Sequence, residues 1–133
     1  MMLQPYERVN DIDFSLTEAE SRARFGAPSR EAVNEVALRE LDYGEQVLRF
    51  QASGRLEEVT TRAPVLHLDA LAVPFAALPG FVQAHDATVF RAGGFIVSPR
   101  FGIAFDPTDS NWVTALAIHC LPQWRALATA PRR

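Results

Sequence analysis

Cysteine is nearly absent from this 133-residue chain, in which Cys120 is the only one. A single cysteine excludes an intramolecular disulfide framework. No apolar run approaches the roughly 20 residues that are needed to cross a membrane. The N-terminal segment also lacks the basic and apolar regions of a signal peptide. We therefore expect a cytoplasmic protein with no membrane partner. A chain of this length can fold as one domain, residues 1–133, without a disulfide or a metal.

Lysine is absent as well, and all 13 basic residues are arginine, a pattern typical of GC-rich coding sequences. Residues 1–60 hold 12 acidic residues and 7 arginines, whereas residues 61–133 hold 4 and 6. A nucleic-acid-binding protein needs a basic patch, so we expect no nucleic-acid partner. An acidic first half suits a basic protein partner. The same charge is also typical of an ordinary solvated surface.

Recognisable catalytic and metal-binding motifs are missing. The sequence has no HxH, HExxH or CxxC spacing, and no serine in a G-x-S-x-G turn. His119 and Cys120 are adjacent and are expected on one strand, where neighbouring side chains point to opposite faces. They would then neither bind the same metal ion nor form a nucleophile–base pair. We therefore predict no catalytic residue, no metal site and no cofactor, with Cys120 as a small buried hydrophobic residue.

A short helix is the first element that the sequence predicts. Thr17 is a good N-cap residue, and Glu20 follows at the spacing of a capping box. Gly26 occupies the position of a helix-ending glycine, and Pro28 prevents continuation. This pattern predicts a helix near residues 17–25.

Short strands separated by tight turns follow in both halves of the chain. The expected strands are Val36–Tyr43, Gln46–Gln51, Leu56–Thr61, Val65–Leu68, Thr88–Arg91, Phe95–Ser98, Gly102–Phe105 and Trp112–His119. At the start of the second half, residues 73–86 predict two short helical turns interrupted at Pro79-Gly80, and near the end of the chain Pro122 begins a last helix.

The predicted fold class is α+β, with one antiparallel sheet of about six or seven strands and helices on one face. The other face would be free to dock a protein. Residues 14–61 and 73–120 each read as a helix followed by a meander, which suggests a degenerate internal duplication.

Two segments carry a resemblance to known families. They are L-T-E-A-E-S-R-A-R-F-G-A-P, residues 16–28, and the R-F-x-x-x-G-R-L-x-x-V pattern of Arg49–Val59. Together they resemble the helix-plus-meander module of β-lactamase inhibitor proteins and of small lipoproteins of the outer-membrane β-barrel assembly machinery. The whole chain is similar to small bacterial immunity proteins. The resemblance implies a protein that binds other proteins and does not catalyse a reaction. The missing export signal, paired cysteines and lipid-bearing cysteine favour a cytoplasmic immunity protein.

The leading hypothesis is therefore an immunity protein that binds and occludes a toxin domain with a basic surface. Its charged contacts are predicted at Glu40, Asp42, Glu45, Glu57 and Glu58, with Tyr43 and Trp112 as aromatic anchors. Because these carboxylates lie near tight turns, we expect them to be solvated. Glu57 and Glu58 would point to opposite faces, whereas Glu40 and Asp42 would share one.

Two alternatives stay open. One is an assembly adaptor that scaffolds a larger complex without inhibiting anything. The other is a ligand-binding or enzymatic domain with an apolar pocket formed by Phe75, Phe81, Phe90, Phe95, Phe101 and Phe105. The sequence does not indicate the oligomeric state.

Overall fold

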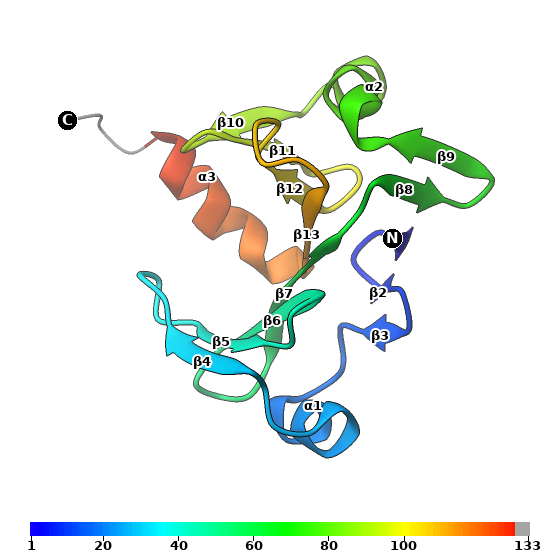
Figure 1. Ribbon diagram of the computed structural model, residues 1–133. Helices are drawn as coiled ribbons and strands as arrows, with labels where there is room; N and C mark the ends of the chain where they lie inside the picture. The colour runs from blue at the N-terminus through cyan, green and yellow to red at the C-terminus, as the bar shows by residue number, and fades with distance from the viewer. Residues whose placement is uncertain (130–133) are drawn as a thin grey trace.

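The computed structural model describes residues 1–129, and over them the chain forms two β-sheets and three α-helices (Figure 1). The larger sheet is antiparallel throughout and has eight strands. In spatial order these are β10 (Phe90–Ala92), β11 (Phe95–Ser98), β12 (Ile103–Phe105), β13 (Trp112–Leu116), β7 (Leu56–Arg62), β6 (Gln46–Phe50), β5 (Arg39–Asp42) and β4 (Arg30–Val33). The α+β class is confirmed, and strands from both expected halves join at the β7–β13 pair.

A second sheet was not expected from the sequence. Its five strands, in spatial order, are β3 (Ile12–Asp13), β2 (Arg8–Val9), β1 (Met2–Gln4), β8 (Val65–Leu68) and β9 (Leu71–Pro74). The β1–β8 pair is parallel and the others are antiparallel. The N-terminal ammonium donates a hydrogen bond to the Val65 carbonyl at 3.0 Å, which fixes the start of the chain beside β8. The prediction of one sheet of six or seven strands is therefore wrong.

Helix α1 (Glu18–Phe25) forms as predicted. The Thr17 hydroxyl accepts from the Glu20 amide at 3.2 Å, and the Glu20 carboxylate accepts from the Thr17 amide at 3.0 Å. This reciprocal pair is the capping box. The helix ends at Gly26, whose φ of +80° favours glycine.

Other elements pack on both faces of the large sheet, in contrast to the expected single helical layer. One face packs against the small sheet and α2 (Leu78–His85), with Leu48, Val59, Leu66, Leu78 and Ile103 among the buried residues. On the opposite face, α3 (Leu121–Thr129) packs against Ala92, Val97, Ala104 and Leu116 through Leu121 and Trp124. Figure 1 shows α3 and the small sheet on opposite sides of the large sheet.

Two local predictions also need correction. Pro79 lies in the first turn of α2, where a missing amide costs no hydrogen bond, so it does not interrupt the helix. The helical segment begins with a 3-10 turn, η1 (Phe75–Ala77), directly after β9. The strand expected to reach residue 119 ends at Leu116, and a second 3-10 turn, η2 (Ile118–Cys120), leads into α3. None of the helices in residues 1–129 is both long and apolar enough to cross a membrane.

Candidate functional site

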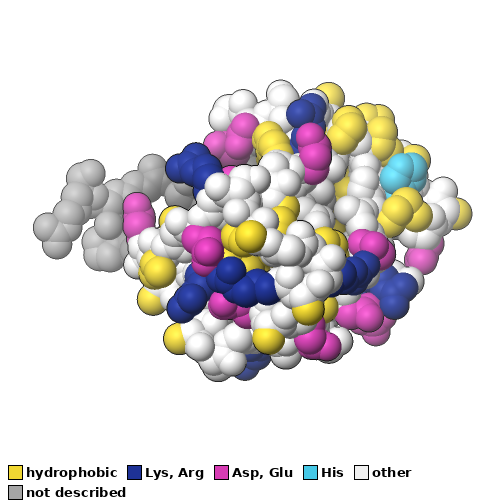
Figure 2. Space-filling view, turned by 60° about the horizontal axis from the view of Figure 1, so that its bottom comes forward, with side chains coloured by type: hydrophobic (Ala, Val, Ile, Leu, Met, Phe, Trp, Pro, Cys, Tyr) yellow, Lys and Arg dark blue, Asp and Glu magenta, His cyan; other side chains and the backbone are white. Residues whose placement is uncertain are grey.

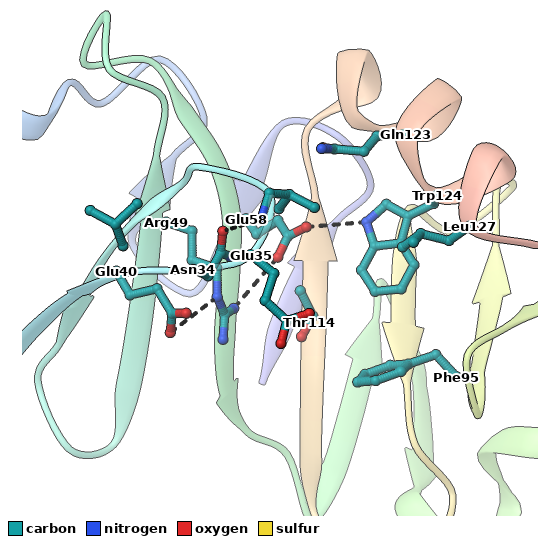
Figure 3. A pocket seen from close by; sticks show the side chains of 12 residues that line it. Asn34, Glu35, Glu40, Arg49, Glu58, Phe95, Thr114, Gln123, Trp124 and Leu127 are labelled. Carbon is teal, nitrogen blue, oxygen red and sulfur yellow. Dashed lines mark hydrogen bonds and ion pairs between the residues drawn. The ribbon is translucent and has the colours of Figure 1, made fainter. Parts of the chain in front are cut away.

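A hollow lies on the face of the large sheet that α3 covers only in part (Figure 3). We call it the groove, and its volume is about 550 Å³. It runs between α3 and the β4–β5 hairpin, and strands β5, β6, β7 and β13 form its floor. The lining residues are Val33, Asn34, Glu35, Val36, Glu40, Arg49, Glu58, Phe95, Thr114, Gln123, Trp124 and Leu127.

A ladder of charged side chains crosses the floor. Glu40, Arg49 and Glu58 lie opposite one another on β5, β6 and β7, because the register pairs each with the next. The Arg49 guanidinium lies 3.5 Å from an oxygen of each carboxylate and donates to the Thr60 hydroxyl at 2.6 Å. Cross-strand alternation thus places one cation between two anions on a single face.

Glu58 is the most enclosed charge of this ladder. It is 8% exposed, and the Trp124 indole donates to its Oε2 atom at 3.1 Å. Burial raises the pKa of the Glu58 carboxyl above its ordinary value, while Arg49 and the Trp124 hydrogen bond act in the opposite direction. The contact joins α3 to β7, so the wall and the floor of the groove are connected through one carboxylate.

The rim of the groove is apolar and open to solvent. Val33 is 68% exposed, and Val36 and Leu127 are exposed as well. Asn34 shapes the β4–β5 turn because its Oδ1 atom accepts from the amides of Val36 and Leu38 at 3.0 and 2.9 Å. The charged groups of the lining are three glutamates and one arginine, so the groove is acidic with apolar edges.

Of the seven predicted contact residues, Glu40 and Glu58 lie in the groove. The Asp42 carboxylate accepts from the Gly44 amide at 2.8 Å in the β5–β6 turn. The Tyr43 hydroxyl donates to the Gly26 carbonyl at 3.1 Å, so this ring packs beside α1.

Glu45 and Trp112 lie together at a different place. Both flank Arg62, whose Nε atom is 3.9 Å from the Glu45 carboxylate and whose guanidinium carbon is 5.9 Å from the Trp112 ring centre. The seven predicted contact residues therefore do not lie together in one place.

The expectation that Glu57 and Glu58 are solvated is wrong. They point to opposite faces of β7 as predicted, but Glu57 is only 2% exposed. Its carboxylate is bonded to the Arg55 guanidinium at 3.1 Å and to the Cys120 thiol at 2.9 Å, and it contacts His119. Turns at the strand ends do not expose these residues, because η2 and α3 return from a distant part of the chain to cover them.

The prediction that His119 and Cys120 point apart is also wrong. It assumed a strand, whereas the 3-10 turn η2 directs both side chains to the Glu57 carboxylate. Burial and the adjacent Glu57 carboxylate raise the pKa of the Cys120 thiol. The thiol therefore stays protonated at neutral pH and is a poor nucleophile in this state.

The six phenylalanines do not line one pocket. Phe75 and Phe105 belong to the main core, where their ring centres lie 6.0 Å apart. Phe81 and Phe101 pack on each other beside the same core. Only Phe95 of the six lines the groove, with its ring centre 5.4 Å from that of Trp124.

The surface around α1 and β4 carries arginines and acidic side chains in alternation (Figure 2). Arg22 contacts both Glu18 and Glu31, at 3.2 and 2.5 Å, and Arg39 lies 3.6 Å from Glu18. Arg22 and Arg39 are therefore each paired locally with acidic side chains on this face.

Comparisons with protein-family models, with curated proteins and with solved structures find no match to this chain. The groove must therefore be interpreted from its own geometry.

Proposed function

We propose that the protein is a non-catalytic binding protein of the immunity class, which occludes a toxin domain by holding a segment of it in the groove. The observation that carries this proposal is the combination of an acidic floor with an exposed apolar rim. Contiguous exposed apolar side chains that border polar groups mark surfaces that bind proteins or ligands. The proposed setting is the cytoplasm.

Charge complementarity favours a basic partner segment. Three glutamates and one arginine line the groove, so an arginine or lysine side chain of the partner would reduce its excess negative charge. Apolar side chains on either side of that cation would contact Val33 and Leu127, which border the groove from opposite walls. This arrangement uses the polar centre for specificity and the rim for affinity.

The neighbouring sheet edge supports a protein partner in preference to a small molecule. β4 is an edge strand of the large sheet, and all four of its residues are exposed. An edge strand presents backbone donors and acceptors that a partner strand can pair with. A peptide segment could use this edge and the groove together, whereas a small ligand would use the groove alone.

The test compares two matched surface variants, Val33→Arg and Leu71→Arg. Both positions are exposed, at 68% and 55%, and both lie on edge strands, β4 and β9. The tagged wild-type protein is used to isolate its partner from native cells, and the partner is identified by mass spectrometry and purified. We expect Val33→Arg to weaken binding at least about tenfold, equal to about 1.4 kcal/mol, and to lose protection of cells that express the partner. Leu71→Arg should bind and protect like the wild type.

Three results would contradict the proposal. Equal binding by both variants would show that the groove is not used. A partner set made of the subunits of a standing complex, with no toxicity to suppress, would favour the adaptor. Release of a small molecule from the wild-type protein but not from Val33→Arg would favour a ligand-binding domain.

A further inference from the structure

A second group of functional side chains lies on the opposite side of β7 from the groove. The Oε2 atom of Glu57 accepts from the Cys120 thiol at 2.9 Å and contacts the Nε2 atom of His119. One oxygen of Glu57, the His119 nitrogen and the Cys120 sulfur all lie within 4.8 Å of one another. An oxygen, a nitrogen and a sulfur atom that could each bind a metal ion thus lie close together.

Backbone hydrogen bonds hold this convergence in place. The Ala117 amide donates to the Glu57 carbonyl at 2.9 Å, and the Cys120 amide donates to the Ala117 carbonyl at 3.0 Å. The first bond attaches the end of β13 to β7, and the second closes the η2 turn. The positions of His119 and Cys120 relative to Glu57 are therefore set by the main chain, and not by flexible side chains alone.

We propose that Glu57, His119 and Cys120 bind a divalent metal ion such as Zn²⁺, with water as the fourth ligand. A thiolate, an imidazole nitrogen and a carboxylate oxygen are the three ligand types that zinc uses in proteins. Closed structural zinc sites use four protein ligands, whereas sites with three protein ligands bind water at the fourth position. The ion would take the place of the thiol hydrogen that now points toward Glu57, and a neutral His119 ring would bind it through Nε2 with its own hydrogen on Nδ1.

Charge and orientation are consistent with such an ion. Binding releases the thiol proton to solvent, and the resulting thiolate and the Glu57 carboxylate together neutralise a divalent cation. Arg55 donates to the other Glu57 oxygen, Oε1, at 3.1 Å, which leaves Oε2 directed at His119 and Cys120. Outer hydrogen bonds of this kind fix a ligand carboxylate in its metal-binding orientation.

An ion can reach the cluster from solvent. The His119 side chain is 32% exposed, and it lines a surface hollow with Thr17, Ser53 and Arg55. Cys120 lies behind it and is buried. The expected entry is therefore through His119, with the thiol as the innermost ligand.

The bound ion would strengthen one wall of the groove. η2 leads directly into α3, and Trp124 of α3 donates to Glu58, the residue that follows Glu57 on β7. The metal would add a second link between β7 and the segment that begins α3. This inference does not rest on the proposed partner, because metal binding is measured on the isolated protein.

The experiment titrates metal-free, reduced protein with Co²⁺ and then displaces it with Zn²⁺. Co²⁺ reports thiolate ligation by a sulfur-to-metal charge-transfer absorption, and a competing chelator gives the Zn²⁺ affinity. The variants are Cys120→Ser and His119→Ala, and the control is His67→Ala, a histidine on β8 outside the cluster. Thermal unfolding with and without Zn²⁺ is measured for each protein.

We expect one ion per chain, a charge-transfer band and a Zn²⁺-dependent rise in Tm for the wild type and for His67→Ala. Cys120→Ser should lose the band. Removing a residue that only hydrogen-bonds a metal ligand can cost about 100-fold in metal affinity, so we expect both ligand variants to lose at least that much. His119 is exposed, so His119→Ala decides the matter even if Cys120→Ser does not fold. The proposal would be overturned if the wild type showed no charge-transfer band, or if His119→Ala kept the wild-type Zn²⁺ affinity. The three side chains would then form only a hydrogen-bonded cluster.

Discussion

At the scale of single residues, Asp86 is the most heavily bonded buried carboxylate. It follows α2 and is only 3% exposed. Its Oδ1 atom accepts from the amide and hydroxyl of Thr88 at 2.8 and 2.5 Å. Its Oδ2 atom accepts from the Ser98 hydroxyl at 2.7 Å and the Arg100 amide at 3.1 Å. One side chain therefore joins the end of α2 to β11 and to the turn after it.

Stability should depend on pH through this carboxylate. Burial alone would raise its pKa, but the hydrogen bonds from Thr88, Ser98 and Arg100 hold the pKa of Asp86 below its ordinary value. Ionised Asp86 therefore stabilises the fold above the unfolded-state pKa of about 4, and this contribution is lost as pH falls through the lower folded-state pKa.

We expect Asp86→Asn to lower the free energy of unfolding by about 3 kcal/mol at neutral pH, because an amide cannot accept all four bonds. The difference from the wild type should shrink below about pH 4. Urea denaturation at neutral pH and at about pH 3 measures both values, with Asp109→Asn in an exposed loop as the control. A difference that is the same at both pH values would contradict the role given to ionised Asp86.

Residue-level prediction from the sequence succeeded where local geometry decides the outcome. Alternation along β7 correctly placed Glu57 and Glu58 on opposite faces. Their burial could not be predicted, because it comes from His119, Cys120 and Trp124, which lie more than 60 positions further along the chain. The direction of His119 was missed for the same reason, since η2 is held by a hydrogen bond to the Glu57 carbonyl.

At the scale of elements, α1 depends on its ends more than on its packing. Ser21 is the only buried residue within the helix, and most of its other residues are charged or small. Such a helix gains little from burial, so the capping box and the ion pairs of Arg22 are the main local contributions. This explains why its boundaries were predictable from residues 17–26 alone.

Removing the cap should therefore have a measurable effect. We expect Thr17→Ala to lower the free energy of unfolding by about 1 kcal/mol, because the Glu20 amide loses its acceptor. Thr17→Ser retains the hydroxyl and should remain close to the wild type. Chemical denaturation monitored by circular dichroism gives both values, and equal losses in the two variants would show that the hydroxyl does not cap the helix.

Other elements carried too little pattern to be predicted. β4 has four exposed residues, Arg30–Val33, and therefore no alternation of buried and exposed positions. The strands β1, β2 and β3 are two or three residues long and are fixed by pairing with one another and with the distant β8. Their formation is a tertiary effect that a local pattern does not encode.

At the scale of the whole molecule, β7 is the element on which both proposed sites depend. It contributes Glu58 to the groove and Glu57 to the cluster on its other side, and it pairs with β6 and β13 near the centre of the large sheet. The groove exists because α3 covers only the part of the sheet near β10 to β13. The remaining part, next to the edge strand β4, is not covered by α3.

Hydrogen exchange tests the central claim, that a partner protein occupies the groove, most directly. The measurement compares amide exchange of the free protein with that of its complex with the purified partner that the wild type retains. We predict slower exchange in the complex at residues 30–36 of the β4–β5 hairpin and at residues 121–127 of α3, with β9 unchanged. Protection confined to β9 and its neighbours, with none at the two walls of the groove, would contradict the account.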